Sequence, residues 1–177
     1  MHAAFSIVVV GVESTGKTTL ARALAERLGW PLVAEQARAW LASRDNRYGA
    51  EDLPLIAALQ DAAERDVRAR HGNLVADTDL SVLRIWSEVR FGHCDRRILD
   101  ALAERPPACY LLTRPDLPWE ADPQRETPDQ DQRLALHDRY RALLAAQAHP
   151  WREIGGVGPA RLAQACAALG EMGLDVA

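Results

Sequence analysis

Four short hydrophobic runs and one short mixed segment along the chain predict β-strands. The first, residues 5–10 (FSIVVV), is apolar and mostly β-branched, which is typical of a strand that is covered on both faces. Similar short apolar runs occupy residues 31–34, 73–76 and 108–113, and residues 151–154 (WREI) are a candidate for a last strand. Strands buried on both faces belong mainly to parallel sheets, so these runs predict a central parallel five-stranded sheet.

Segments with helical spacing separate the apolar runs. They predict helices over residues 18–28, 35–42, 52–71, 80–91, 95–104 and 129–148, and a closing helix that follows Pro159 and ends near Leu169. Residues 114–128 are crowded with Pro, Asp, Arg and Glu, which predicts a loop. Alternating strands and helices indicate an α/β fold in which helices flank the sheet. The 177 residues (1–177) contain no linker or repeat and are expected to form a single domain.

The first strand leads into a glycine-rich stretch, GVESTGKTTL, which matches the pattern G-x-x-x-x-G-K-[ST]. In this pattern the backbone N–H groups turn inward around nucleotide phosphates, the lysine reaches the β- and γ-phosphates, and the final hydroxyl helps to hold Mg²⁺. The following helix directs its positive end toward the same anion. Lys17 is therefore the expected catalytic cation and Thr18 an expected metal ligand. The expected nucleotide contacts are Gly11, Glu13, Ser14, Thr15, Gly16, Lys17, Thr18 and Thr19.

Glu13 places a carboxylate within this anion-binding loop. If the loop amides point inward, side chains in the middle of the loop point outward. Glu13 would then face a neighbouring pocket for the phosphoryl acceptor, where it accepts hydrogen bonds from sugar hydroxyls or faces a positive charge. The alternative is a glutamate that faces solvent or caps the helix.

Two more carboxylates follow predicted strands, at the edge of the sheet where ligands bind in open α/β folds. Asp77 would hold the metal through water or accept a proton from an attacking hydroxyl. The alternative is that Asp77 or Asp79 caps the next helix, and we assign this role to Asp79. Glu35 and Arg38, one helical turn apart, either act on the acceptor or form a simple ion pair. For the catalytic base or metal contact, Asp77 is the first candidate and Glu35 the second.

Residues 114–133 are predicted to form a lid over this site. Guanidinium groups neutralise the charge that develops on a transferring phosphoryl group, and a mobile lid excludes water. Arg125 and Arg133 are the expected catalytic arginines, and a solvated charged loop is the alternative. Three of the five tryptophans, Trp40, Trp86 and Trp119, lie in segments near the pocket, where they would suit a flat cationic ring. Trp30 and Trp151 are expected to serve packing.

The composition limits the other classes of function. The net charge of −4 and the absence of a basic stripe argue against a nucleic-acid partner. The apolar N-terminal run is too short to cross a bilayer and lacks signal-peptide features, so we expect a cytoplasmic protein without membrane contact. Cys94, Cys109 and Cys166 are expected to be reduced thiols. The histidines lack metal-ligand spacing and are expected to be surface or structural residues: His2, His71, His93, His137 and His149.

Taken together, five segments resemble the kinase domain of NadR-like nicotinamide riboside kinases and the related P-loop ATPases. The segments are GVESTGKTTLARALA, VAEQARAWL, LVADTDLSVLRIW, YLLTRPDLPWEADPQR and IGGVGPARLAQA. The resemblance extends from Phe5 to about Leu169, and it implies a P-loop kinase fold with ATP and Mg²⁺ as cosubstrate and cofactor. Besides the phosphate loop, the matched positions are Glu35, Arg38, Asp77, Trp86, Asp116, Trp119 and Arg125.

The resemblance implies transfer of the γ-phosphate of ATP to the ribose 5′-hydroxyl of nicotinamide riboside. Glu35, Arg38, Trp86, Asp116 and Trp119, together with Glu13, are then the expected substrate contacts. In the related thymidylate kinases a carboxylate at the place of Glu13 faces the acceptor, which suits the positively charged pyridinium of nicotinamide riboside. A kinase for another nucleoside or nucleotide, an ATPase, and a non-catalytic ATP-binding sensor are the alternatives. The oligomeric state is open.

Overall fold

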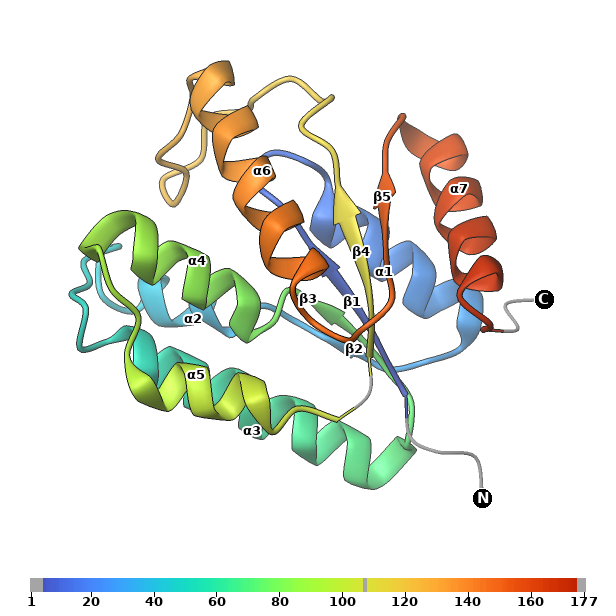
Figure 1. The fold of residues 1–177 in the computed structure, drawn as a ribbon, viewed down its shortest axis with the longest axis horizontal. Coiled ribbons are helices and arrows are strands. Elements are labelled where there is room, and N and C mark those ends of the chain that lie inside the picture. Colours follow the sequence, from blue (N-terminus) through green and yellow to red (C-terminus); the bar gives the residue numbers. More distant parts are fainter. Residues whose placement is uncertain (1–4, 107, 175–177) are drawn as a thin grey trace.

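A parallel sheet of five strands forms the centre of the molecule (Figure 1). The structure is a computed structural model and describes residues 5–106 and 108–174. The strand order is β2-β3-β1-β4-β5, and every neighbouring pair is parallel, as the apolar runs predict. The strands are β1 (Ser6–Val10), β2 (Leu32–Val33), β3 (Leu74–Asp77), β4 (Ala108–Thr113) and β5 (Trp151–Ile154).

Seven helices of the described chain connect and cover the strands. Six have ends close to the predicted ones, and α6 ends at Ala145 instead of residue 148. None of the helices within the described ranges is long and apolar enough to span a bilayer. The helices are α1 (Lys17–Leu28), α2 (Gln36–Ala42), α3 (Leu53–His71), α4 (Leu80–Phe91), α5 (Arg96–Ala103), α6 (Gln130–Ala145) and α7 (Gly158–Glu171).

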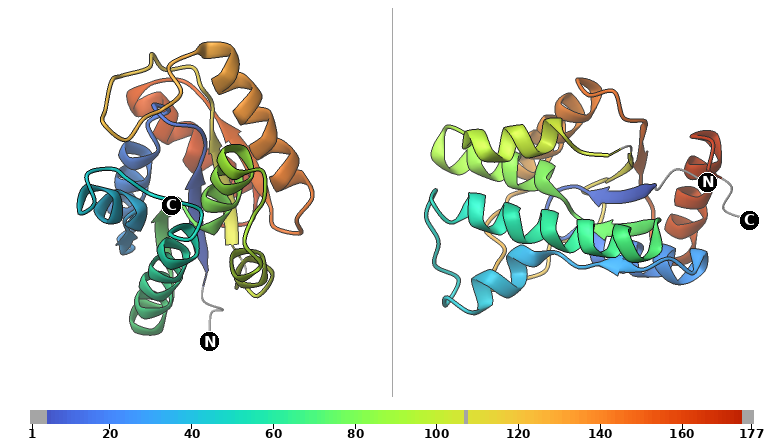
Figure 2. Two further views of the ribbon diagram at one scale, coloured as in Figure 1. Left: turned by 90° about the vertical axis from the view of Figure 1, so that its left-hand side faces the viewer. Right: turned by 90° about the horizontal axis from the view of Figure 1, so that it is seen from below.

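Helices cover both faces of the sheet, which explains why its three central strands are buried at every position and mostly apolar (Figure 2). On one face, side chains of β1 such as Ile7 and Val9 pack with α1 and α7. On the other face, Val8 and Val10 pack with α4 and α6. Trp30 packs against the first of these clusters and Trp151 against the second, as expected.

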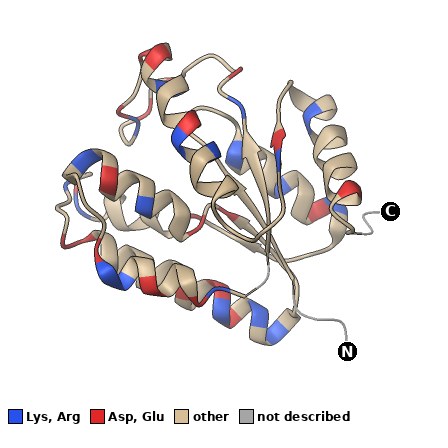
Figure 3. Ribbon diagram, viewed as in Figure 1, with Lys and Arg blue, Asp and Glu red and all other residues tan. Residues whose placement is uncertain are grey.

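A third hydrophobic cluster lies beside the sheet, between α2, α3, α4 and α5. Its buried side chains include Ile56 of α3, Leu83 of α4 and Ile98 of α5. Acidic and basic residues are intermixed along α3, α4 and α5 (Figure 3), and several form ion pairs four positions apart, for example Arg84 with Glu88 at 2.9 Å. Their helical lobe therefore has its own core and a mixed-charge surface.

The remaining predictions about individual residues have clear outcomes. The three cysteines are free. Asp79 caps α4 by accepting a hydrogen bond from the Ser81 amide at 2.8 Å, which confirms the assigned role. His71 and His93 are exposed, whereas His137 is buried and lies 3.3 Å from the Glu153 carboxylate. His149 is partly buried against the Tyr110 ring. His2 lies outside the described residues.

A buried charged cluster supports the start of α4. The Asp79 carboxylate accepts a hydrogen bond from the Tyr110 hydroxyl at 2.8 Å and lies 3.5 Å from the Arg105 guanidinium. Arg105 also pairs with Glu64 at 2.5 Å. Burial raises the pKa of Glu64, and the charge of Arg105 opposes this shift.

We expect Tyr110→Phe to destabilise the fold by about 1.5 to 3 kcal/mol, because a hydrogen bond to a buried charged acceptor is lost. Urea unfolding measures this change. Tyr140→Phe is the matched control, since the buried Tyr140 makes no hydroxyl hydrogen bond within residues 5–106 and 108–174. Equal stabilities of the two variants would contradict the prediction.

Candidate active site

The loop between β1 and α1 approaches the end of β4 so closely that its first position requires glycine. A Cβ atom on Gly11 would lie 2.4 Å from the Thr113 hydroxyl oxygen, and the φ of Gly11 is 143°. The φ angles of Ser14 (55°) and Gly16 (74°) are also positive. Such turns point successive backbone N–H groups to one side and form an anion-binding concavity. The Thr15 hydroxyl, 2.7 Å from the Val12 carbonyl and 2.6 Å from the Thr113 hydroxyl, fixes this loop.

Three charged groups meet at the mouth of the loop. The Lys17 ammonium donates a hydrogen bond to the Val12 carbonyl at 2.8 Å. Burial lowers the pKa of Lys17, and the carboxylates of Glu35 and Asp77 oppose this change. Burial also raises the pKa of Glu35, with Lys17 acting in the opposite direction. Glu35 and Asp77, from the ends of β2 and β3, therefore lie in the same electrostatic environment as Lys17.

Asp77 is the last residue of β3 rather than the first residue after it, because it is in register with Val9 of β1. Its side chain is buried, and Oδ1 has no hydrogen-bond partner. Such an oxygen, on a carboxylate that acts electrostatically on Lys17 of the phosphate loop, suits Mg²⁺, which commonly binds one or two carboxylates together with substrate phosphates. Among the described residues, no three His, Cys, Asp or Glu side chains form a metal site by themselves. The residues present thus fit a cation that binds together with phosphate.

A cavity of about 770 Å³ extends from the phosphate loop toward α2 and α4. Its floor is the loop, and its far wall contains apolar side chains, among them Ile85, Trp86 and Tyr140. The predicted site residues that line the cavity are Gly11, Glu13, Ser14, Thr15, Gly16, Lys17, Thr18, Thr19, Glu35, Arg38, Trp86 and Arg125. The other four do not line it: Asp77, Asp116, Trp119 and Arg133.

Glu13 binds the segment that joins β4 to α6, which neither of our alternatives for this residue included. Its carboxylate accepts hydrogen bonds from the Glu126 amide at 2.9 Å, from the Thr127 amide, and from the Trp119 indole at 3.3 Å. These donors lie more than a hundred residues away in the sequence. The carboxylate in the phosphate loop therefore holds the 114–133 segment in place.

Arg133 strengthens the same junction. It is fully buried and donates hydrogen bonds to the carbonyls of Glu13 (3.4 Å), Ser14 (3.3 Å) and Leu117 (3.3 Å). The Glu120 amide adds a 3.0 Å hydrogen bond to the Ser14 hydroxyl. In this arrangement, the guanidinium of Arg133 binds protein carbonyls beneath the loop.

We expect Glu13→Ala to release the 119–127 region, because three donors lose a charged acceptor that is worth about 1.5 to 3 kcal/mol per hydrogen bond. The amides of Glu126 and Thr127 should exchange their hydrogens at least about tenfold faster. Hydrogen exchange read by mass spectrometry measures this change. Glu120→Ala, which removes an exposed carboxylate from the same segment, is the control. Unchanged exchange in Glu13→Ala would contradict the prediction.

Two residues at or behind the cavity wall were not singled out by the sequence patterns. Tyr48 does not line the cavity but packs against Trp86, which does. The two ring centroids are 4.5 Å apart with planes tilted by 57°, and the Tyr48 hydroxyl accepts a hydrogen bond from the Trp86 indole at 2.7 Å. Burial raises the pKa of Tyr48 to about 12. Arg90 lies over the Tyr48 ring and pairs with Glu126 at 3.0 Å. Arg90 follows Trp86 by one helical turn, a spacing that could have identified it.

The remaining predicted residues have other partners. Arg38 pairs with Glu35 at 3.3 Å and with Asp122 at 3.4 Å, so the expected ion pair is present and the side chain also lines the cavity. Arg125 donates a hydrogen bond to the Glu120 carbonyl at 2.6 Å. Trp40 packs against the helical lobe, with the Arg44 guanidinium 4.1 Å from its ring centroid.

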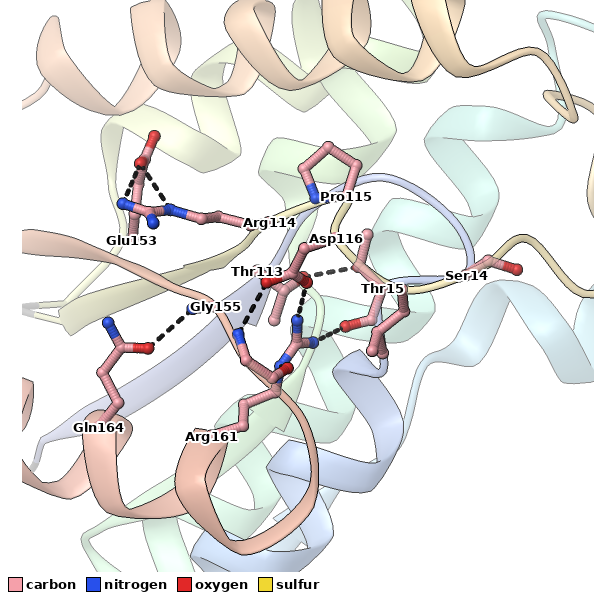
Figure 4. A network of polar contacts seen from close by, with 12 residues as sticks. Ser14, Thr15, Thr113, Arg114, Pro115, Asp116, Glu153, Gly155, Arg161 and Gln164 are labelled. Carbon is pink, nitrogen blue, oxygen red and sulfur yellow. Dashed lines mark hydrogen bonds and ion pairs between the residues drawn. The ribbon is translucent and has the colours of Figure 1, made fainter.

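Asp116 is directed toward α7, away from the cavity lining (Figure 4). Its carboxylate pairs with Arg161 and accepts a 2.7 Å hydrogen bond from the Gly156 amide. No local pattern could indicate this partner, because Arg161 lies 45 residues further along the chain.

Comparison with known proteins agrees with this geometry. Residues 6–161 match the model of a family described as an AAA domain. The chain belongs to this AAA domain family. The match includes the phosphate loop, all five strands and the first turn of α7. No curated protein matches the sequence significantly.

The AAA domain is also similar to solved structures of P-loop kinases. A NadR protein in complex with NAD and AMP-PNP is 22% identical with a TM-score of 0.75, and 98% of this chain and 51% of that one are covered. A NadR protein in complex with NR has 21% identity, a TM-score of 0.73, and coverages of 99% and 54%. The chain thus spans about half the length of these proteins. A thymidylate kinase from Ehrlichia chaffeensis has 12% identity and a TM-score of 0.69, with 97% and 100% covered. These likenesses confirm the P-loop kinase fold.

Proposed function

We propose that this AAA domain is an ATP-dependent small-molecule kinase that phosphorylates the ribose 5′-hydroxyl of nicotinamide riboside. The observation that carries the proposal is the cavity. It adjoins the phosphate loop at one end, and at the other end it is lined by the carboxylates of Glu35 and Glu126 and by the aromatic ring of Trp86. Such a cavity provides space for a second molecule next to the γ-phosphate. The fold supports the proposal, since similar structures contain AMP-PNP in one case and NR in another.

In this mechanism the phosphate loop binds the triphosphate of ATP through its backbone amides, and Lys17 neutralises charge on the β- and γ-phosphates. Thr18 and Asp77 are the residues that would hold Mg²⁺. When bound, this ion neutralises the charge that develops on the phosphate oxygens. The enzyme needs no covalent intermediate, because positioning and electrostatics supply the rate enhancement.

Glu35 is our choice for the general base. It lines the cavity, and burial raises its pKa above the usual carboxyl value, toward the range in which a base is effective. It would accept the proton of the 5′-hydroxyl while that oxygen attacks the γ-phosphorus and the bond to the ADP oxygen breaks. Asp77 does not line the cavity, so we assign it to the metal.

The 114–133 segment is the proposed lid. It is held by Glu13 of the phosphate loop and also contacts α2 and α4 through the Arg38–Asp122 and Arg90–Glu126 ion pairs. A segment held from three sides would exclude water from the transferring group. Arg125 lines the cavity and is the proposed cation for the transition state, whereas Arg133 is proposed to hold the loop.

A second candidate, a kinase that acts on a nucleoside monophosphate, is favoured by the charges on the wall. Arg38 and Arg90 both line the acceptor end of the cavity and pair there with Glu35 and Glu126. The positively charged pyridinium of nicotinamide riboside would compete with these arginines for the two carboxylates. The phosphate of a nucleoside monophosphate would instead bind the guanidinium groups directly.

Acceptor-dependent release of ADP tests the proposal. The protein is given Mg-ATP with nicotinamide riboside, with other nucleosides, with nucleoside monophosphates, or with no acceptor. Stimulation by nicotinamide riboside and formation of its mononucleotide support the first proposal, and stimulation by a monophosphate supports the second. Equal ADP release without an acceptor indicates an ATPase. Binding of ATP without turnover indicates a sensor, and either result would overturn the kinase assignment.

A further inference from the structure

The side chain of a buried arginine outside the cavity contacts a backbone carbonyl of the phosphate loop (Figure 4). Arg161 lies in the first turn of α7 and is 4% exposed. Its Nη1 donates a hydrogen bond to the Thr15 carbonyl, and its Nε donates one to the Gly156 carbonyl at 2.7 Å. Its Nη2 pairs with the Asp116 carboxylate. One side chain thus joins the connections that follow β1, β4 and β5.

Asp116 and the neighbouring glycines fix the orientation of this guanidinium. The second Asp116 oxygen accepts a hydrogen bond from the Gly156 amide at 2.7 Å. A Cβ atom on Gly155 would lie 2.9 Å from this same oxygen, and one on Gly16 would lie 3.3 Å from Arg161 Nη1. This close packing holds the planar guanidinium group of Arg161 in one orientation. The ammonium group of a lysine could not make the same three contacts.

The bond to Thr15 determines where the next amide points. In a trans peptide the carbonyl oxygen and the following N–H point in opposite directions. The Thr15 carbonyl faces Arg161, so the Gly16 N–H faces the other way, and Gly16 lines the cavity. A cation at the carbonyl end of a peptide also polarises its N–H and makes it a stronger donor.

We propose that Arg161 is a positioning residue for nucleotide binding, which orients and polarises the Thr15–Gly16 peptide for the phosphates. The inference rests on the proposed function only in that a nucleotide triphosphate occupies the loop. It does not depend on the identity of the acceptor. Pre-orientation of a donor removes an ordering cost from binding, so loss of Arg161 should weaken phosphate binding.

Calorimetric titration of Arg161→Lys with AMP-PNP and with tripolyphosphate tests the proposal. We expect both affinities to fall by about tenfold or more, the factor that one charge-assisted hydrogen bond typically supplies. Adenosine should bind as it does to the unchanged protein, because it has no phosphate. Arg152→Lys, which alters an exposed arginine paired with Glu171 on the surface, is the control and should bind all three ligands normally.

Asp116→Asn keeps the test decisive if Arg161→Lys does not fold. This variant retains the shape of the side chain but removes the charge that holds the guanidinium, and a smaller loss of both phosphate ligands is expected. A folded Arg161→Lys or Asp116→Asn that binds tripolyphosphate with unchanged affinity would overturn the positioning role, as would a loss confined to adenosine. Failure of the unchanged protein to bind AMP-PNP would instead overturn the proposed function, and this inference with it.

Discussion

Lys17→Ala is expected to reduce the proposed phosphoryl transfer by about 10² to 10³, close to complete loss, while the protein stays folded. In the proposed mechanism the ammonium is the charge that the phosphate loop presents to the β- and γ-phosphates, and loss of one such preorganised group costs about 10² to 10³ in rate. The fold should tolerate the change because the ammonium donates a single hydrogen bond, to Val12, within the described residues. Burial already opposes its charged form, as the lowered pKa of Lys17 indicates.

The rate of ADP formation with the best acceptor measures the first effect, and thermal unfolding measures the second. Arg27→Ala removes an exposed cation from the last turn of the same helix and is the matched control, which should keep full activity. A folded Lys17→Ala protein with full activity would show that the loop does not bind the transferred phosphate.

The second large effect is expected for Glu35→Gln. The amide cannot accept the proton of the attacking hydroxyl, and removal of a general base lowers the rate by about 10² to 10⁴. Glu35→Asp should recover part of the activity because it restores a carboxylate, although one that is shorter. A change in kcat with little change in KM for ATP would separate this role from nucleotide binding.

The pH dependence gives an independent check on Glu35. A base must be deprotonated to act, so activity should be low in acid and rise as the pH passes the pKa of Glu35. Burial raises this pKa, so the midpoint should lie above the value of about 4.3 for an ordinary glutamate. In Glu35→Gln the residual rate should lose this acidic limb. An acidic limb that persists unchanged in the variant would assign the titration to another group.

Much of the fold follows from local patterns. The central strand β4 (Ala108–Thr113) is buried at every position and almost entirely apolar, and it has the predicted bounds. The edge strand β5 (Trp151–Ile154) also has the predicted bounds, although it contains Arg152 and Glu153. Bounds that depend on pairing were less predictable. Asp77 belongs to β3 because its backbone is in register with Val9, and β2 has two residues because it pairs only with β3 at the edge of the sheet.

The same contrast applies to the candidate site. The phosphate loop could be predicted because its glycines, lysine and hydroxyl lie within eight consecutive positions. The partners of Glu13 could not, because Trp119 lies 106 residues away, on a segment without regular structure. Arg161 lies 146 residues from Thr15, and an arginine within a helix carries no sign that it will be buried. Local motifs therefore identify the chemistry, whereas long-range packing determines which side chains support it.

The helical lobe has a consequence for how new specificities arise on this scaffold. The wall of the cavity opposite the phosphate loop is formed largely by α2 and α4, which pack around a separate core that contains Leu83 and Ile98. The phosphate loop, in contrast, follows strand β1 of the sheet. Substitutions at Trp86 or Arg90 can therefore change what enters the cavity without disturbing the strands that hold Lys17. If the proposed function holds, libraries restricted to the cavity-facing positions of these two helices should change the acceptor while the binding of ATP is preserved.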